Sequence, residues 1–182
     1  LFLHAGWMHL ICNMLFLWVF GDNIEDSMGH TRFILFYFIC GILATLTHAI
    51  VEYGSNTPLI GASGAISGIL GAYLVIHPKA RVLVLFMNII PLRLPAIIVL
   101  GGWIGLQFLS LGKETGTAWW AHIGGFIAGM ILIIPFRKKQ IPLLSPLNHL
   151  GKAKTIITSF KQAPTIIPQT TNKNKPYKKD ID

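Results

Sequence analysis

Long apolar blocks of helical length constrain this chain more than any other feature. The chain has 182 residues, of which 53% are apolar and 12% charged, and its mean hydropathy is +0.60. A soluble domain of this length does not need so much apolar residue, and continuous apolar blocks in a helical chain are typical of membrane spans. We therefore expect an all-α, polytopic membrane helix bundle. The five expected spans cover residues 7–20, 32–51, 61–76, 95–111 and 118–134.

A sixth apolar piece, residues 82–90, is too short to cross a bilayer. We expect it to be an interfacial or re-entrant piece between the third and fourth spans. Several of the five spans are themselves near the short end for a hydrocarbon core of about 30 Å, which predicts little tilt or a locally thinned bilayer.

The charged residues divide the chain into two parts. Residues 1–135 carry five basic and five acidic side chains, whereas residues 136–182 carry ten basic and two acidic, so the second part holds the whole net charge of +8. The first part is the expected membrane core. The second is expected to be a mostly disordered basic tail, whose lysines either contact anionic lipid or are simply solvated. Without a basic motif interleaved with aromatics, the charge does not indicate a nucleic-acid partner.

Basic residues in the short loops give the orientation of the spans. Arg32 lies between the first two spans, Lys79, Arg81 and Arg93 lie between the third and fourth, and residues 137–139 follow the fifth. Alternating spans place these three sites on one side, which the positive-inside rule makes cytoplasmic. We expect a multi-pass protein of the cell (plasma) membrane with a cytoplasmic C-terminal tail.

The same alternation brings four polar residues to one depth. The first, third and fifth spans are parallel and begin at the non-cytoplasmic face, where they carry His9, Asn13, Ser63 and His122. At 1.5 Å per residue, all four are expected within roughly 10 Å of that surface. Strongly polar groups inside membrane segments are costly, and they are functional candidates for that reason.

Ser63 and His122 together indicate a nucleophile and its general base. A serine hydroxyl needs a base to remove its proton, and a neutral imidazole is the usual one near pH 7. The apolar parts of the third and fifth spans contain no carboxylate, so a third group that orients the histidine is not visible. The sequence therefore predicts a serine–histidine dyad that hydrolyses a bond within the membrane.

The residues around Ser63 fit the binding of an oxyanion. Gly61, Ala62 and Gly64 surround it at the start of a helix, where backbone N–H groups lack intrahelical acceptors and the helix dipole favours negative charge. His9 and Asn13, four residues apart, share one helical face and could complete an oxyanion hole. His4 is expected to brace a loop.

Simpler interpretations of these residues remain open. A serine in a membrane helix often bonds to its own backbone, and a histidine often serves packing. Gly64/Gly68 and Gly125/Gly129 match small-xxx-small helix packing, which needs no catalysis.

A metal site or a disulfide is not expected. His4, His9 and His122 could together bind a metal, but they match no HExxH-type spacing and have no carboxylate with them, so we expect neither metal nor cofactor. Cys12 and Cys40 are expected to be reduced and packed as small hydrophobes.

Four motifs over residues 3–135 together resemble the rhomboid family of intramembrane serine proteases. They are His4-xxxx-His9-xxx-Asn13, then Gly21, Glu25, Gly29 and Arg32, then Gly61-Ala62-Ser63-Gly64, and finally Ala121-His122-xx-Gly125-xxx-Gly129.

The resemblance implies a role for each motif. Ser63 would be the nucleophile, His122 its base, and His9 and Asn13 would bind the oxyanion with backbone near Ser63. The second motif, with Glu25 and Arg32, would be structural, in a cytoplasmic-side polar network; Gly125 and Gly129 would complete the last motif. The partners implied are transmembrane protein substrates and the lipid bilayer, and no oligomeric state is indicated.

The resemblance also sets expectations for the whole fold. It implies a six-helix core, of which five helices are expected here and the first is missing, and it makes residues 95–111 the helix discussed as a lateral gate. Many family members carry an aromatic residue four positions after the nucleophile, stacked on the histidine, where this chain has Ser67. The base is then either held less firmly or held by another ring. The alternative function is a catalytically inactive rhomboid-like protein that binds or escorts membrane clients; a transporter is a third interpretation, but no broken-helix pairs with charged midplane residues support it.

Overall fold

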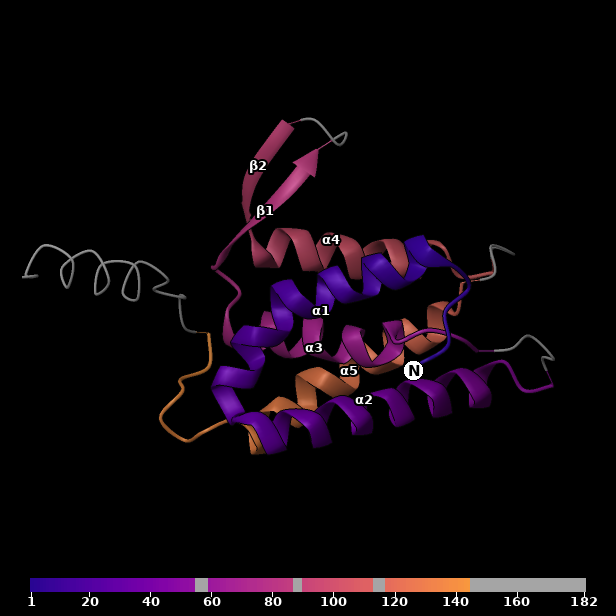
Figure 1. Cartoon of the computed structure of the whole chain (residues 1–182), viewed down its shortest axis with the longest axis horizontal. Helices are drawn as coiled ribbons and strands as arrows, with labels where there is room; N and C mark the ends of the chain where they lie inside the picture. Colours follow the sequence, from indigo (N-terminus) through magenta and orange to yellow (C-terminus); the bar gives the residue numbers. More distant parts are fainter. Residues whose placement is uncertain (55–58, 87–89, 113–116, 145–182) are drawn as a thin grey trace, which may run out of the picture. The chain divides into compact units, whose positions relative to one another are not determined.

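The computed structural model describes residues 1–54, 59–86, 90–112 and 117–144. These residues form a mostly helical bundle with one small hairpin (Figure 1). The expected helical bundle is confirmed, and the predicted disordered tail lies outside the described residues from 145 onward. The elements are α1 Trp7–Met28, α2 His30–Val51, α3 Ser63–Ile76, β1 Arg81–Phe86, β2 Ile90–Pro95, α4 Ala96–Leu109 and α5 Trp119–Phe136.

Helix α1 runs eight residues beyond its predicted end at residue 20. The polar Gly21-Asp22-Asn23 sequence ends the apolar block but not the helix, because Ile24 and Met28 continue the buried face that Phe20 begins. The turn into α2 comes at Gly29, whose φ of 93° is a conformation that glycine adopts without steric cost. The helix therefore ends at Met28 and not near residue 20; within the sequence expected to end it, Asp22 is exposed, Asn23 is half-buried and Gly21 is buried.

Of the piece predicted as interfacial or re-entrant, residues 82–86 lie in β1, which pairs antiparallel with β2 in a hairpin that projects from the bundle (Figure 1). Residues 87–89 of that piece lie outside the described residues. In its register Leu83 faces Arg93, and both side chains are exposed, whereas Val82 and Val84 on the alternate face pack against the core. This period-2 pattern of β-branched residues is typical of a strand with one buried face.

The last helix passes over its predicted stop at Pro135 and ends at Phe136. The N–H of Arg137 still donates to the carbonyl of Ile133 at 3.0 Å. Proline lacks the N–H that would donate to the preceding turn. Because Pro135 lies in the last turn, the helix can still end one residue after it, at Phe136.

Helix α3 packs between α5, α2 and α1, and most of its residues are buried. Glycines make its approach to α5 close. A methyl group added at Gly129 would lie 2.6 Å from the Cα of Gly68, and one at Gly125 would lie 3.0 Å from the carbonyl carbon of Gly64. The small-xxx-small pairs are therefore the contact surface between these two helices, and they fix how near their first turns come.

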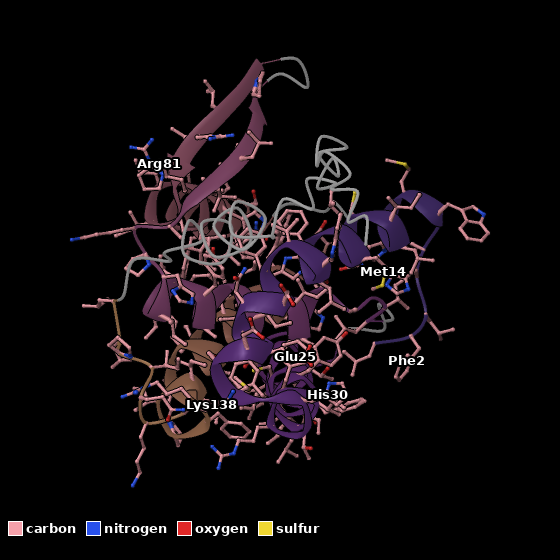
Figure 2. The ribbon with its side chains drawn as sticks, turned by 60° about the vertical axis from the view of Figure 1, so that its left-hand side comes forward. Phe2, Met14, Glu25, His30, Arg81 and Lys138 are labelled. Atoms are coloured by element: carbon pink, nitrogen blue, oxygen red, sulfur yellow. The ribbon has the colours of Figure 1, made fainter. Side chains whose placement is uncertain are left out.

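The end of the bundle that the loop charges predict to be cytoplasmic is held by hydrogen bonds to backbone carbonyls. Lys138 donates its backbone N–H to the carbonyl of Ser27 and its ammonium to the carbonyl of Asp26. Glu25 and His30 form an ion pair at 2.5 Å beside the turn between α1 and α2, at the same end as Lys138 (Figure 2). Glu25 thus has a side-chain partner at the end of the bundle where α5 leaves it, while the network role of Glu25 and Arg32 stays a prediction.

Candidate active site

Ser63 is the first residue of α3, and a tight turn at Gly61 comes directly before it. Gly61 has a φ of 107°, and a Cβ at this position would lie 2.8 Å from the imidazole of His9. Only glycine combines that backbone conformation with that close neighbour. Ala62, buried, leads into the helix, and its carbonyl accepts the N–H of Ile66 at 3.0 Å. The chain therefore turns sharply to present the Ser63 hydroxyl at a helix start.

His122 meets Ser63 across the α3–α5 contact. Its Nε2 lies 2.9 Å from the Oγ of Ser63, within hydrogen-bond range. The two residues are 59 positions apart in the chain, and Gly125, one turn after His122, packs on Gly64, the residue after Ser63. The glycine contact and the hydrogen bond are thus parts of one close approach.

The other ring nitrogen of His122 also has a partner. Nδ1 lies 2.8 Å from Oε1 of Gln107 on α4. Gln107 is only 6% exposed, and its Nε2 donates to the carbonyl of Trp103 at 3.2 Å. Sequence reasoning missed this residue because it looked for carboxylates only. The available signal was a single amide inside the apolar block at residues 95–111.

Two indole rings flank His122 in place of the absent aromatic at position 67. The ring of Trp103 lies 5.8 Å from the imidazole, tilted by 36°, and that of Trp119 meets it edge-on at 6.3 Å. Ser67 is buried and donates its hydroxyl to the carbonyl of Ser63 at 2.7 Å. Of the two alternatives for position 67, the structure agrees with the second, because the ring of Trp103, from a different helix, lies beside His122.

One cavity of about 860 Å³ joins the polar residues predicted from the first, third and fifth spans. His9, Asn13, Ser63 and His122 all line it. The remaining lining residues that matter here are Ser67, Trp103, Ala118, Trp119, His48 and Glu52. The structure thus brings the four residues to the same end of the bundle, opposite the end where Lys138 lies.

The cavity offers two kinds of donor for an oxyanion. The first N–H groups of α3, at Ser63 and Gly64, have no acceptor within the helix. Asn13 is buried, and its Nδ2 donates to the carbonyl of His9 at 3.0 Å, which leaves a second amide hydrogen. His9 lies with its ring against Gly61. Asn13 and Ser63 both line the cavity.

His4 and Arg32, which belong to the predicted motifs, are not among the residues that line this cavity. His4 stacks its ring edge-on against His9 at 5.2 Å, and its Nε2 is buried without a partner among the described residues. This contact agrees with a bracing role. Arg32 donates to the carbonyl of Phe136 at 3.5 Å, at the end of the bundle where α5 ends, and among the described residues it is not paired with Glu25.

The described residues offer little for a metal or a disulfide. No group of three or more His, Cys, Asp or Glu side chains in the described ranges is arranged to hold a metal ion. Both cysteines are free; Cys40 is buried as expected, whereas Cys12 is exposed and lines the cavity, so its predicted packing as a buried hydrophobe was wrong.

Two of the described helices, α2 and α5, are long and apolar enough to cross a membrane by length and composition. Helices α3 and α4 are apolar but have 14 residues each, about 21 Å at 1.5 Å per residue. Many large apolar side chains of the bundle, such as Ile42 and Leu106, are exposed on its outer surface. A lipid environment gives such side chains a favourable place.

Comparison with known proteins gives one family. The Rhomboid domain matches residues 1–139. Rhomboid protease GluP of Bacillus subtilis (strain 168) is 34% identical over 127 residues, which cover 70% of this chain and 23% of that protein. RHOMBOID-like protein 5 of Arabidopsis thaliana is 33% identical over 140 residues, covering 72% of the chain and 40% of the relative.

A third relative extends the same pattern. Rhomboid-like protease 3 of Toxoplasma gondii is 28% identical over 141 residues, which cover 76% of this chain and 50% of that protein. The chain thus spans between 23% and 50% of the length of these three relatives. No solved structure matches it.

Proposed function

Because this chain belongs to the rhomboid family, we propose that it is an intramembrane serine endopeptidase that cleaves transmembrane segments of other membrane proteins. The observation that carries the proposal is the 2.9 Å approach of His122 Nε2 to Ser63 Oγ inside a cavity between apolar helices. Family membership makes it a membrane protein, and relatives named as proteases support the activity.

The first half of the reaction uses the two residues in the order nucleophile and base. His122 Nε2 takes the proton of the Ser63 hydroxyl as Oγ attacks the carbonyl carbon of the scissile peptide. The carbonyl oxygen becomes an oxyanion, which the N–H groups at the start of α3 and the side-chain amide of Asn13 stabilise. The protonated His122 then gives its proton to the leaving amine, and an acyl-enzyme remains on Ser63.

The second half repeats these steps with water. His122 removes a proton from a water molecule, the hydroxide attacks the acyl carbon, and Ser63 leaves with the proton restored. The polar side chains that line the cavity, among them His48 and Glu52, would give water hydrogen-bonding partners inside it. The substrate, a membrane helix, would enter between helices from the bilayer.

The test compares cleavage of a model transmembrane substrate by membrane-reconstituted variants. Ser63→Ala and His122→Ala are each expected to lose at least about 10³-fold in kcat, since a nucleophile and its base act as a unit. Ser110→Ala and His30→Ala, which change the same residue types away from the cavity, should cleave as the unchanged protein does.

Two results would overturn the proposal. Full cleavage by Ser63→Ala or His122→Ala would refute the mechanism. A folded, unchanged protein that binds the substrate without cleaving it would favour the inactive, client-binding alternative.

The proposed location is the cell membrane, with the basic tail of residues 136–182 in the cytoplasm. The support is the charge pattern, since Arg32, Arg93 and Lys138 all belong to the loops assigned to one side. Protease digestion of intact cells tests it: a tag after residue 182 should stay protected until the membrane is broken. A tag digested in intact cells would reverse the orientation.

A further inference from the structure

The side-chain amide of Gln107 occupies the edge of the His122 ring that faces away from Ser63. We propose that Gln107 is a positioning residue, which fixes the tautomer and the ring orientation of His122. The inference rests on the proposed role of His122 as the general base, and it supplies a neutral third member where the sequence predicted only a dyad.

The orientation of the Gln107 amide follows from its own hydrogen bonds. Its Nε2 lies 3.2 Å from the carbonyl oxygen of Trp103, which can only accept. If the amide were flipped, two acceptor oxygens would face each other at that distance. The carbonyl end, Oε1, must therefore be the atom that lies 2.8 Å from Nδ1 of His122.

This orientation selects one tautomer of the imidazole. Since Oε1 of Gln107 is an acceptor, Nδ1 of His122 must carry the proton and donate it. In the neutral ring, Nε2 then holds the lone pair, and it is Nε2 that lies 2.9 Å from the Ser63 hydroxyl. The opposite tautomer would present an N–H to Ser63 and could not remove its proton.

The surroundings of Gln107 indicate that this bond has a purpose beyond packing. Helix α4, described along its whole length, buries only Ala96, Leu100 and Gln107. A buried amide costs free energy unless its groups are hydrogen-bonded, and here the carbonyl is used on His122 and the NH₂ on Trp103. Gln107 is thus the only polar residue among the three buried residues of α4, and its side chain is the one that contacts His122.

Helix α4 holds the ring as well as its edge. Trp103, one turn before Gln107, lays its indole 5.8 Å from the imidazole of His122. Residues four apart lie on the same helical face, so a single face of α4 presents both the amide and the indole to His122. The amide fixes rotation in the plane of the ring, and the indole limits rotation out of it.

The experiment replaces Gln107 in the membrane-reconstituted protein with one residue that lacks the acceptor and one that keeps it. Gln107→Met preserves the length of the side chain but offers Nδ1 no oxygen. It should lower kcat about 10- to 100-fold with KM within about 3-fold, because orientation of a general base affects the chemical step rather than substrate binding. Leu106→Met, which places the same residue on the exposed face of α4, should leave kcat unchanged.

Gln107→Glu separates orientation from packing. In its protonated form the Glu side chain keeps both hydrogen bonds, because one oxygen accepts the Nδ1 proton and the hydroxyl donates to the carbonyl of Trp103, so kcat should stay within about 5-fold of the unchanged protein. Equal losses in Gln107→Met and Gln107→Glu would show that the amide serves packing, and a kcat within 3-fold in a folded Gln107→Met would show that it orients nothing. Either result overturns the inference while leaving the Ser63→Ala test of the proposed function intact.

A second measurement needs no turnover. The ¹⁵N chemical shifts of His122 in protein labelled at histidine, assigned with His122→Ala, report which ring nitrogen is protonated. We expect a protonated Nδ1 and an unprotonated Nε2 in the unchanged protein, and a mixture of tautomers in Gln107→Met. A protonated Nε2 in the unchanged protein would overturn the inference even if Gln107→Met did not fold.

Discussion

The substitution Gly125→Ala tests whether the glycine contact between α3 and α5 sets the Ser63–His122 distance. The added methyl carbon would lie 3.0 Å from the carbonyl carbon of Gly64 and nearer still to its oxygen, whereas ordinary contact begins at 3.4 Å. A methyl carbon at Gly129, in the same helix contact, would lie 2.6 Å from the Cα of Gly68, which is about 0.8 Å closer than ordinary contact allows. Both positions require the helices to separate by about 1 Å.

That separation acts directly on the hydrogen bond. Gly125 lies one turn after His122, and Gly64 follows Ser63, so the displacement is carried to the pair almost unchanged. The Nε2–Oγ distance of 2.9 Å would become about 3.9 Å, beyond hydrogen-bond range. A misplacement of about 1 Å in a reacting group can cost about 10²-fold in rate, so we expect Gly125→Ala to lose about that much kcat.

The assay is cleavage of a model transmembrane substrate by reconstituted protein, together with thermal unfolding. Overpacking should lower the free energy of unfolding by about 1–3 kcal/mol, which leaves a folded population to measure. The matched control is Gly105→Ala on α4, where an added Cβ would meet no atom within 4 Å. Cleavage by Gly125→Ala at more than a third of the rate of the unchanged protein would refute the reasoning.

Further predictions concern the surroundings of the pair. Gly61→Ala forces a side chain into a φ of 107° and against His9; it should destabilise the fold by about 1–3 kcal/mol and lower cleavage, and an unchanged melting temperature would contradict this. Trp103→Leu should reduce kcat about 3- to 10-fold, because His122 loses the indole that limits its tilt. Steady-state kinetics would detect this decrease; an unaltered kcat would show that the indole of Trp103 does not hold His122. Glu25→Gln removes the charge from the contact between Glu25 and His30, whose side chains are 36% and 76% exposed. The free energy of unfolding should therefore fall by less than about 1 kcal/mol; a decrease several times larger would mean that Glu25 stabilises more than this contact. Chelators should leave cleavage unchanged, and inhibition reversed by added metal would oppose the serine mechanism.

The sequence was sufficient to predict that four polar residues share one end of the bundle. The bilayer imposes alternating spans, and basic loop residues such as Arg32 and Arg93 give their direction. Because the third and fifth spans are then parallel, Ser63 and His122 at their starts lie near the same membrane surface. Their separation of 2.9 Å could be predicted only as a possibility, because it depends on how closely two helices pack.

The third partner of His122 could not be predicted in the same way. Which face of residues 95–111 turns toward His122 depends on packing between helices, and the apolar block has no strong periodicity that would fix this face. The hairpin was missed for a related reason: the apolar block at residues 82–90 covers most of the first strand but only the first residue of the second, which continues through Pro91 and Arg93. Prolines at strand ends and charged residues on the exposed face are compatible with a two-stranded hairpin, but they hide it from a search for apolar blocks.

The most direct test of the central claim is covalent labelling of Ser63 by a fluorophosphonate probe in the membrane-reconstituted protein, read by mass spectrometry of the peptide that contains it. An activated serine reacts with such a probe, whereas an ordinary serine hydroxyl does not. The account predicts one adduct on Ser63 that disappears in His122→Ala while Ser110 stays unlabelled. No adduct on Ser63 in the folded protein, or an adduct that persists in His122→Ala, would contradict it.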